Sequence, residues 1–288
     1  MIGAVQVERL RKSEVFQELR SAILSQVASL PEARVREMSD DQIAASISDE
    51  QRDLRENQFL MLRIEGLIVK LLGEVAHEDY GSLQFPVNIR SLASGISLRG
   101  SFNNRGYATD LIHCDGWSGA PSDSWNHLLY LLYMPDAPYL EMFETLAPDS
   151  PLREYIGDYK SVHIDTAELK KVSVTPESGL LAIWPTYSPH RTVVPVRSST
   201  HRAWRVSIDF RTRSATPYVE DRNCPKGTFS STKMNSAGVY WTFPRQEFLN
   251  LESKMSAELR AAARHGTDAL ANRQDYLHQY YQTGEHER

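Results

Sequence analysis

The fold is decided by one stretch in which apolar and polar residues alternate without exception, Trp204-Arg205-Val206-Ser207-Ile208-Asp209-Phe210-Arg211. Successive side chains of a β-strand point to opposite faces of a sheet, so this period of two predicts a strand with one apolar and one polar face. An arginine on an inner face is costly unless it has a partner. The polar face is therefore either a solvated surface with exposed ion pairs or the wall of a binding site.

The surrounding residues 83–213 have the composition of a β-rich region. Short runs rich in Val, Ile, Leu, Tyr and Trp alternate there with clusters of Gly, Pro, Asn and Ser. Many short strands separated by turn residues are typical of a sandwich or barrel. We predict strands at 84–90, 95–102, 106–113, 125–134, 139–144, 161–164, 169–175, 179–184, 190–196 and 202–211.

Helical patterns flank this strand-rich region. In the first 80 residues, apolar side chains recur at helical spacing up to Pro31, and again after a capping box at 48–51. We expect these apolar faces to be buried against a sheet. They comprise Phe16, Leu19, Ile23, Val27 and Leu30 in the first helix, and Leu60, Ile64, Leu67, Leu71 and Val75 in the second.

A further helical pattern occupies 248–259, whereas 214–243 has little pattern and could be a lid or an irregular loop. We expect a single domain over residues 1–288. It divides into N-terminal helices (1–80), a β core (83–213), and a loop with C-terminal helices (214–288).

Composition and charge narrow the class of protein. The chain has 288 residues and a formal net charge of −5, so it lacks the positive charge that binds nucleic acid or anionic lipid. Its most apolar stretch, 59–75, is interrupted by Arg63, Glu65 and Lys70, and a spanning helix needs about 20 mostly apolar residues. Two cysteines in a chain of this length are typical of a protein in the reducing cytoplasm. The charged residues near the start do not fit a signal peptide, so we expect a cytoplasmic location. We expect a small-molecule substrate, no nucleic-acid partner and no membrane, and the oligomeric state stays open.

Three His-x-Asp sequences occur, at 77–79, 113–115 and 163–165. On a strand, residues i and i+2 project to the same face, so the motif places an imidazole beside a carboxylate. A second histidine from a distant strand would complete the two-histidine, one-carboxylate triad that binds Fe(II) with open positions. The first motif ends a helical pattern and the third lies close to the next suitable histidine. We therefore favour His113 and Asp115.

His190 is the favoured third ligand. It follows a buried strand and a turn and itself begins a strand, far enough beyond Asp115 for several strands to intervene. Two rivals fit less well, because His127 lies in the next strand after Asp115 and His201 shares a strand with Arg205.

Arg205 and Ser207 lie on the polar face of their strand. A guanidinium binds a carboxylate through two hydrogen bonds, and a neighbouring hydroxyl adds another. Alone, the pair fits an exposed strand equally well. Together with the upstream ligand set it indicates a binding site for an anion.

In this order, His113-x-Asp115, His190 and Arg205-x-Ser207 resemble the Fe(II)/2-oxoglutarate-dependent dioxygenase superfamily. The resemblance covers about residues 83–213. It implies an α+β protein with a mainly β core, a double-stranded β-helix (jelly-roll, cupin-like) flanked by N- and C-terminal helices. It also implies Fe(II) on His113, Asp115 and His190, and 2-oxoglutarate held through its C5 carboxylate by Arg205 and Ser207.

The resemblance further implies O2 as a cosubstrate, decarboxylation of 2-oxoglutarate to succinate, and oxidation of a C–H bond of a small polar molecule. Halogenating relatives lack the carboxylate ligand. Because Asp115 is present, hydroxylation, desaturation or ring closure is expected instead. The stretch 110–125 is similar to natural-product tailoring hydroxylases, so a biosynthetic role is expected.

Other readings stay open. Trp117 and Asn126 are candidates for contact with the substrate, although each could simply pack a loop or a strand edge. Cys114, between two ligands, is expected to point away from iron and to pack in the core. The chain could also be a cupin-like metal enzyme without 2-oxoglutarate, or a non-catalytic β-sandwich binding module. Neither a G-x-S-x-G nor a G-x-G-x-x-G motif is present, so hydrolase and dinucleotide-dependent functions lack support.

Overall fold

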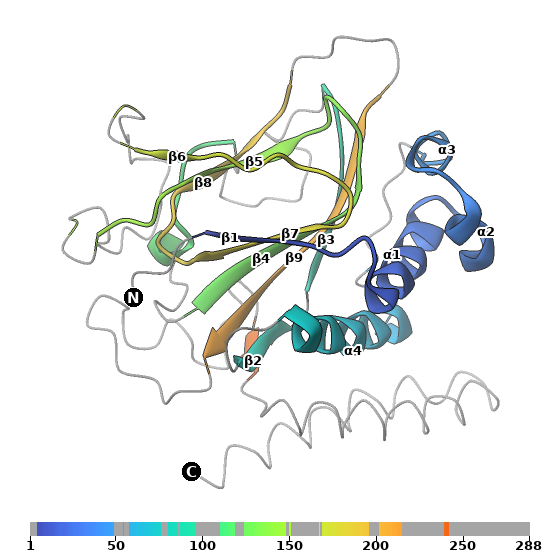
Figure 1. Ribbon diagram of the computed structural model, residues 1–288, viewed down its shortest axis with the longest axis horizontal. Coiled ribbons are helices and arrows are strands. Elements are labelled where there is room, and N and C mark those ends of the chain that lie inside the picture. Colours follow the sequence, from blue (N-terminus) through green and yellow to red (C-terminus); the bar gives the residue numbers. More distant parts are fainter. Residues whose placement is uncertain are drawn as a thin grey trace, which may run out of the picture. The chain divides into compact units, whose positions relative to one another are not determined.

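A computed structural model of the chain shows two antiparallel β-sheets with α-helices against one of them (Figure 1). It describes residues 5–48, 54, 58–75, 80–85, 87–95, 110–118, 124–147, 150, 167, 169–195, 202–214 and 239–241.

The larger sheet is centred on β4 (Ser124–Tyr133), which pairs with β7 (Leu180–Pro185) on one side and β9 (Trp204–Ser214) on the other. Its spatial order is β1-β7-β4-β9-β2-β10, and β3 also pairs with β9. The remaining strands are β1 (Gln6–Arg9), β2 (Tyr80–Phe85), β3 (Asn88–Ala93) and β10 (Val239–Trp241).

The smaller sheet consists of β5 (Tyr139–Phe143), flanked by β6 (Lys171–Val172) and β8 (His190–Val193). An isolated bridge between His113 and His190 extends this sheet beyond β8. From β4 onward the chain crosses repeatedly between the sheets, because β4, β7 and β9 belong to the larger one and β5, β6 and β8 to the smaller one. Two such sheets built by alternating crossings form a jelly roll. The predicted α+β class with a double-stranded β-helix core is confirmed.

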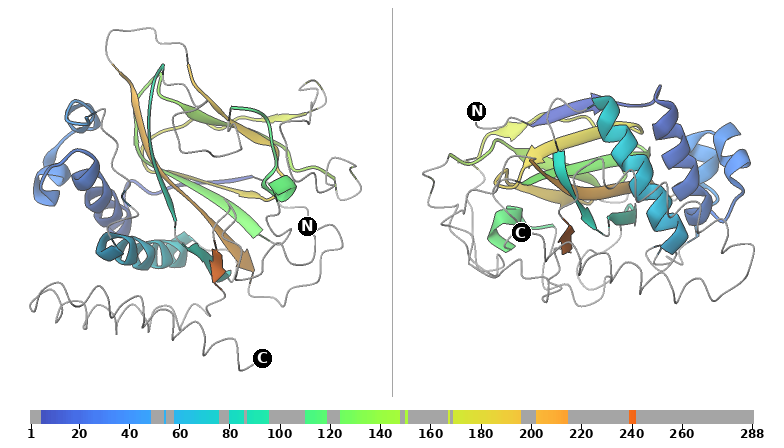
Figure 2. Two further views of the ribbon diagram at one scale, coloured as in Figure 1. Left: turned by 180° about the vertical axis from the view of Figure 1, so that it is seen from behind. Right: turned by 90° about the horizontal axis from the view of Figure 1, so that it is seen from below.

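Two hydrophobic clusters hold these layers together. The cluster between the sheets comprises Leu128, Tyr130, Met142, Leu180, Ala182 and Trp184. The other packs the helices α1 (Glu14–Val27) and α4 (Gln58–Val75) against the opposite face of the larger sheet (Figure 2). The two predicted N-terminal helices and the burial of their apolar faces are thereby confirmed.

Several predicted elements differ from the structure. The first 80 residues are not all helical, since Gln6–Arg9 form β1 along the edge of β7. Four residues are too few to show a period, and here the available sheet edge decides the conformation. The strand predicted at 84–90 falls in two strands, because β2 ends at Phe85 and β3 begins at Asn88.

The other predicted strands are found with changed ends. The strands predicted at 169–175 and 190–196 are shorter, at Lys171–Val172 and His190–Val193. The strand predicted at 202–211 runs on to Ser214. The patternless segment 214–243 contributes β10. Outside the described residues, wholly or in large part, lie the strands at 95–102 and 161–164, the capping box at 48–51 and the C-terminal helix. Of the strand predicted at 106–113 only 110–113 are described, and they form no strand apart from the isolated bridge between His113 and His190.

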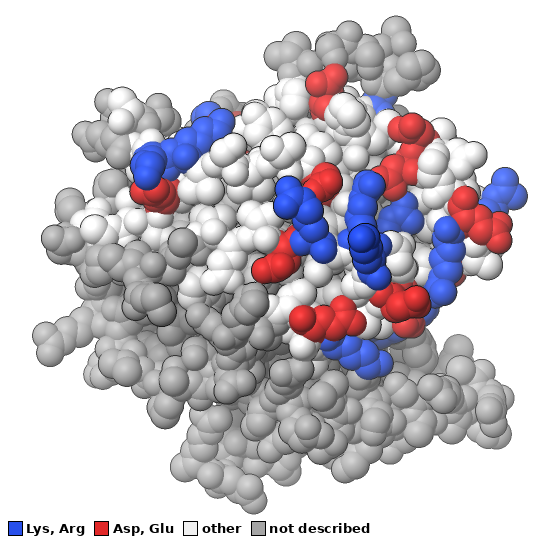
Figure 3. Space-filling view, viewed as in Figure 1, with Lys and Arg blue, Asp and Glu red and all other residues white. Residues whose placement is uncertain are grey.

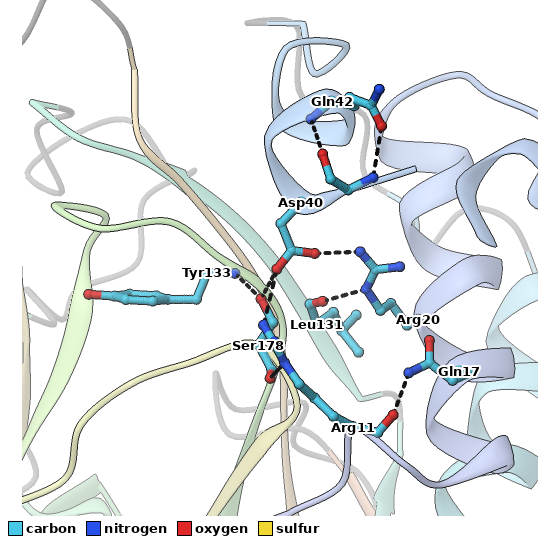
Figure 4. A network of polar contacts seen from close by, with 9 residues as sticks. Arg11, Gln17, Arg20, Asp40, Gln42, Leu131, Tyr133 and Ser178 are labelled. Carbon is cyan, nitrogen blue, oxygen red and sulfur yellow. Dashed lines mark hydrogen bonds and ion pairs between the residues drawn. The ribbon is translucent and has the colours of Figure 1, made fainter. Parts of the chain in front are cut away.

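A polar network ties the N-terminal helices to the sheet (Figure 4). Asp40, at the start of α3 (Asp40–Ala44), accepts hydrogen bonds from Arg20 of α1 at 2.5 Å and from the hydroxyl of Ser178 at 2.5 Å. Arg20 also donates to the carbonyl of Leu131 in β4, and the Ser178 hydroxyl accepts from the backbone N–H of Tyr133. One carboxylate therefore joins two helices to the central strand and to the turn before β7.

The surface carries charge of both signs. On the face drawn in Figure 3, the described basic and acidic side chains lie beside one another instead of forming a patch of one sign. Ion pairs among the described residues include Arg63–Glu32 and Lys171–Glu141, at 2.6 and 2.7 Å. Among the described helices, none has the length and apolarity that a membrane crossing requires.

The network predicts the effect of removing its central carboxylate. We expect Asp40→Ala to lower the free energy of unfolding by about 1–3 kcal/mol, because the side chain of Arg20 is only 10% exposed and would lose its counter-charge. Denaturant titration measures this change. Asp41→Ala is the matched control, since Asp41 is exposed in the same helical turn, and its effect should stay within about 0.5 kcal/mol. Equal effects of the two substitutions would refute the structural role of Asp40.

Candidate metal centre

His113 and His190 face one another across the extended edge of the smaller sheet. The backbone N–H of each donates to the carbonyl of the other, at 3.0 and 2.9 Å. Directly opposed residues of an antiparallel pair project to the same face, so the two imidazoles lie together, with ring centroids 4.4 Å apart. Both rings are buried, with 6% exposure each.

Local hydrogen bonds select the ring nitrogen that can bind a metal. Nδ1 of His113 lies 2.8 Å from the carbonyl oxygen of Leu111, and Nδ1 of His190 lies 2.9 Å from that of Ser188. A carbonyl oxygen only accepts, so Nδ1 carries the proton in each ring. In a neutral ring of this tautomer, Nε2 carries the lone pair that can bind a cation.

Asp115 begins a short 3-10 helix, η2 (Asp115–Ser118), directly after His113 and Cys114. The next residue must be small, because a Cβ atom on Gly116 would stand 2.5 Å from the ring of Tyr187. Tyr187 lies in the turn between β7 and β8, so this contact presses η2 against the chain that leads to His190. Oδ1 of Asp115 lies 4.0 Å from Nε2 of His190.

The predicted ligand set is therefore brought together. His113, Asp115 and His190 each offer one ligand atom, and these atoms lie within 4.8 Å of one another. Two imidazoles and one carboxylate leave positions open on a six-coordinate ion, the arrangement found for non-haem Fe(II). Within the described residues, the geometry thus fits a divalent transition metal with exchangeable ligands.

Burial keeps the imidazole of His113 neutral. Burial and, to a smaller extent, the neighbouring His190 together lower the pKa of His113 to about 4. For Asp115, burial alone would raise the pKa, but the charge of Arg211 and the two histidines outweigh it and hold that pKa below its usual range. At neutral pH the centre consequently offers an unprotonated imidazole and an ionised carboxylate, the forms that bind metals.

The polar face of β9 lies between the two sheets. Leu128 and Tyr130 of β4 belong to the cluster between the sheets, and their partners across the strand pair are Asp209 and Ser207. Opposed residues share a face, so the polar side chains of β9 point inward with them. The alternative of an exposed strand with solvated ion pairs is wrong.

Arg205 and Ser207 are buried on this inner face, with 2% and 0% exposure. Among the described residues, Nε and Nη1 of Arg205 and the hydroxyl of Ser207 find no hydrogen-bond partner. The guanidinium carbon lies 6.0 Å from the ring centroid of Tyr130. Burial lowers the pKa of Arg205, as expected for a cation without a counter-charge at hydrogen-bond distance. This pair of donors is suited to an anion.

Further polar side chains of the interior were not identified as site residues from the sequence. Arg211 donates to Oδ2 of Asp115 and to Oδ1 of Asn126, and Arg90 of β3 makes two hydrogen bonds to Asp209, at 2.7 and 2.8 Å. The alternation of β9 could have indicated Arg211, because it lies on the same face as Arg205. Its partner, however, is 96 residues away in the sequence.

The other candidate site residues lie in different surroundings. Asn126 is buried opposite Trp184, and its amide nitrogen has no partner among the described residues. Cys114 is buried and not part of the ligand set, as expected. His127 stacks on Phe210, with ring centroids 4.7 Å apart, away from the metal ligands. The side chain of Trp117 lies outside the described residues, as do His201 and the motifs at 77–79 and 163–165.

Comparison with known proteins finds solved structures to which this chain is similar. Neither a protein-family model nor a curated protein matches the sequence. The chain is similar to SnoN, a non-haem α-ketoglutarate-dependent epimerase from nogalamycin biosynthesis, at 10% identity over 83% of this chain and 89% of that one, with a TM-score of 0.40. It is also similar to the carbocyclase SnoK of the same biosynthesis (12% identity, 75% and 84% covered, TM-score 0.39).

A third similar structure is an N-substituted L-amino acid dioxygenase from Burkholderia ambifaria (12% identity, 72% and 82% covered, TM-score 0.37). At such low identity, the reaction and substrate of this chain have to be inferred from its own residues.

The buried histidines predict how stability depends on pH. Burial lowers the pKa of His113 to about 4 and that of His127 to about 3, from an unfolded value near 6.5. Between these values the unfolded chain binds protons that the folded chain does not, so stability is complete above pH 6.5 and falls as the pH drops towards 4. Each histidine should contribute a loss on the order of 1 kcal/mol between pH 7 and pH 5.

Denaturant titration of the metal-free protein at the two pH values measures this loss. His127→Leu should reduce the difference between the two pH values, whatever it does to stability at pH 7. If the variant and the wild type lose the same amount, His127 is not held neutral by burial.

Proposed function

We propose that the chain is an Fe(II)- and 2-oxoglutarate-dependent oxygenase. One observation carries the proposal: the inner face of the jelly roll holds a two-histidine, one-carboxylate cluster and, on β9, the buried Arg205 and Ser207. Among the described residues, Nε and Nη1 of Arg205 and the hydroxyl of Ser207 have no hydrogen-bond partner. A buried cation without a counter-charge is unfavourable, so Arg205 calls for an anion supplied from outside the chain. An anionic cosubstrate that also reaches the metal meets both requirements.

The two groups of residues would bind the two ends of such a cosubstrate. His113, Asp115 and His190 would hold Fe(II), leaving positions for the keto acid end of 2-oxoglutarate and for O2. Arg205 would bind the far carboxylate through its guanidinium, and Ser207 would donate a further hydrogen bond. When bound, iron and 2-oxoglutarate supply the oxidising power through decarboxylation to succinate.

The protein's own part is to bind, orient and exclude water. The cluster of Leu128, Tyr130 and Met142 lines the space between the sheets with apolar surface, which strengthens the pairing of Arg205 with an anion. The Nδ1 hydrogen bonds fix both imidazole rings, so that their Nε2 atoms keep one orientation.

For the reaction we propose hydroxylation of a C–H bond, or a related oxidation such as desaturation or ring closure, on a small polar molecule. Asp115 supplies the carboxylate ligand, so no metal position is set aside for a halide. We further propose a role in natural-product biosynthesis, with residues 1–288 as a single dioxygenase domain and with Trp117 and Asn126 near the substrate.

Anaerobic titration tests the metal and the cosubstrate separately. Fe(II) should bind in a one-to-one ratio, and 2-oxoglutarate should then produce a visible charge-transfer band. Arg205→Ala should weaken 2-oxoglutarate binding by about 10- to 100-fold while metal binding persists, because only the carboxylate partner is lost. Arg202→Ala is the control, since Arg202 is exposed just before β9.

His190→Ala should abolish one-to-one metal binding, and with it the band. Tight metal binding without any band would favour a cupin-like metal enzyme that acts without 2-oxoglutarate. A wild-type protein that binds no metal would leave a non-catalytic binding module and refute the oxygenase.

A further inference from the structure

Arg211 binds one particular oxygen of the Asp115 carboxylate, Oδ2. Its Nη2 lies 2.8 Å from Oδ2 of Asp115, and its Nε lies 3.2 Å from the same oxygen. The other carboxylate oxygen, Oδ1, is the one placed 4.0 Å from Nε2 of His190. The two oxygens of Asp115 thus face different partners, the guanidinium of Arg211 on one side and the imidazole of His190 on the other.

The position of Arg211 is itself fixed. Its Nε also donates to Oδ1 of Asn126 at 2.8 Å, and Asn126 is the residue directly opposite Arg211 in the pairing of β4 with β9. The side chain of Arg211 is 15% exposed and that of Asp115 is 12% exposed, so water competes little for these hydrogen bonds. The guanidinium is therefore anchored to the central strand of the larger sheet and presents its donors to η2.

We propose that Arg211 is a positioning residue that restricts Asp115 to binding the metal through one oxygen, Oδ1. This inference rests on the metal centre of the proposed function. A carboxylate can bind a cation through one oxygen or both. Binding through both would require Oδ2 to leave the two donors of Arg211 in a nearly dry environment, which is costly for the carboxylate and for the arginine.

One-oxygen binding sets the number of positions that stay open. A six-coordinate ion held by two imidazoles and a single carboxylate oxygen has three positions for exchangeable ligands. A second carboxylate oxygen would occupy one of them. Arg211 would thereby keep one more coordination position open at the metal without binding the metal itself.

Counting metal-bound water tests this role without relying on turnover. Mn(II)-loaded protein is placed in 17O-labelled water, and the broadening of its electron paramagnetic resonance signal gives the number of bound waters. The wild type should keep three, and Arg211→Gln should lose one because Asp115 gains a second bond to the metal. Arg211→Lys should restore the wild-type number, since an ammonium group can still hold Oδ2.

Arg191→Gln is the matched control. Arg191 follows His190 directly and carries the same charge, but it pairs with Glu141 at 2.6 Å, with 37% of its side chain exposed. Its substitution should leave three waters. An equal loss in both variants, or no loss in Arg211→Gln, would overturn the inference.

A second measurement needs no variant. In wild-type protein labelled with 13C-aspartate, metal addition should shift the carboxylate stretching bands of Asp115 to the separation typical of one-oxygen binding. A separation typical of two-oxygen binding would overturn the inference while leaving the oxygenase intact. A wild-type protein that binds no Mn(II) would instead refute the proposed function itself.

Discussion

Two backbone hydrogen bonds between His113 and His190 are the interaction on which the site depends. They make the two residues direct neighbours in an antiparallel pair, so both imidazoles reach the same point without a long or flexible side chain. Asp115 follows two residues later, held by the close approach of Tyr187 to Gly116, and the ring of Trp184 packs edge-on against His190. The metal centre is therefore a property of sheet pairing more than of any single loop.

The inner face of β9 places unusual demands on the fold, because it carries charged groups into a space that is otherwise apolar. Two of them are neutralised within the chain, Asp209 by Arg90 and Arg211 by Asp115. Arg205 is different, since Nε and Nη1 of its guanidinium meet no acceptor among the described residues. Buried charges in proteins are normally paired, so the exception marks the place where a ligand completes the structure.

Much of this could be predicted from local sequence. The period of two in β9, the helical periods of α1 and α4, and the spacing of His113 and Asp115 each lie within a few consecutive residues. The pairing of strands lies outside that range. Whether the polar face of β9 is buried depends on its register with β4, and the partner of Arg211 depends on where η2 packs. The short strand β1 was missed because its conformation comes from the edge of β7 and not from its own residues.

The pairing of His113 with His190 also determines when the centre can exist. Contacts between residues so far apart in the sequence form slowly, because a long loop must close before they stabilise anything. On the ribosome, a nascent chain that has emerged only as far as β7 contains His113 and Asp115 but not their partner. A metal that needs all three ligands would therefore be bound only after the segment around His113 has paired with β8.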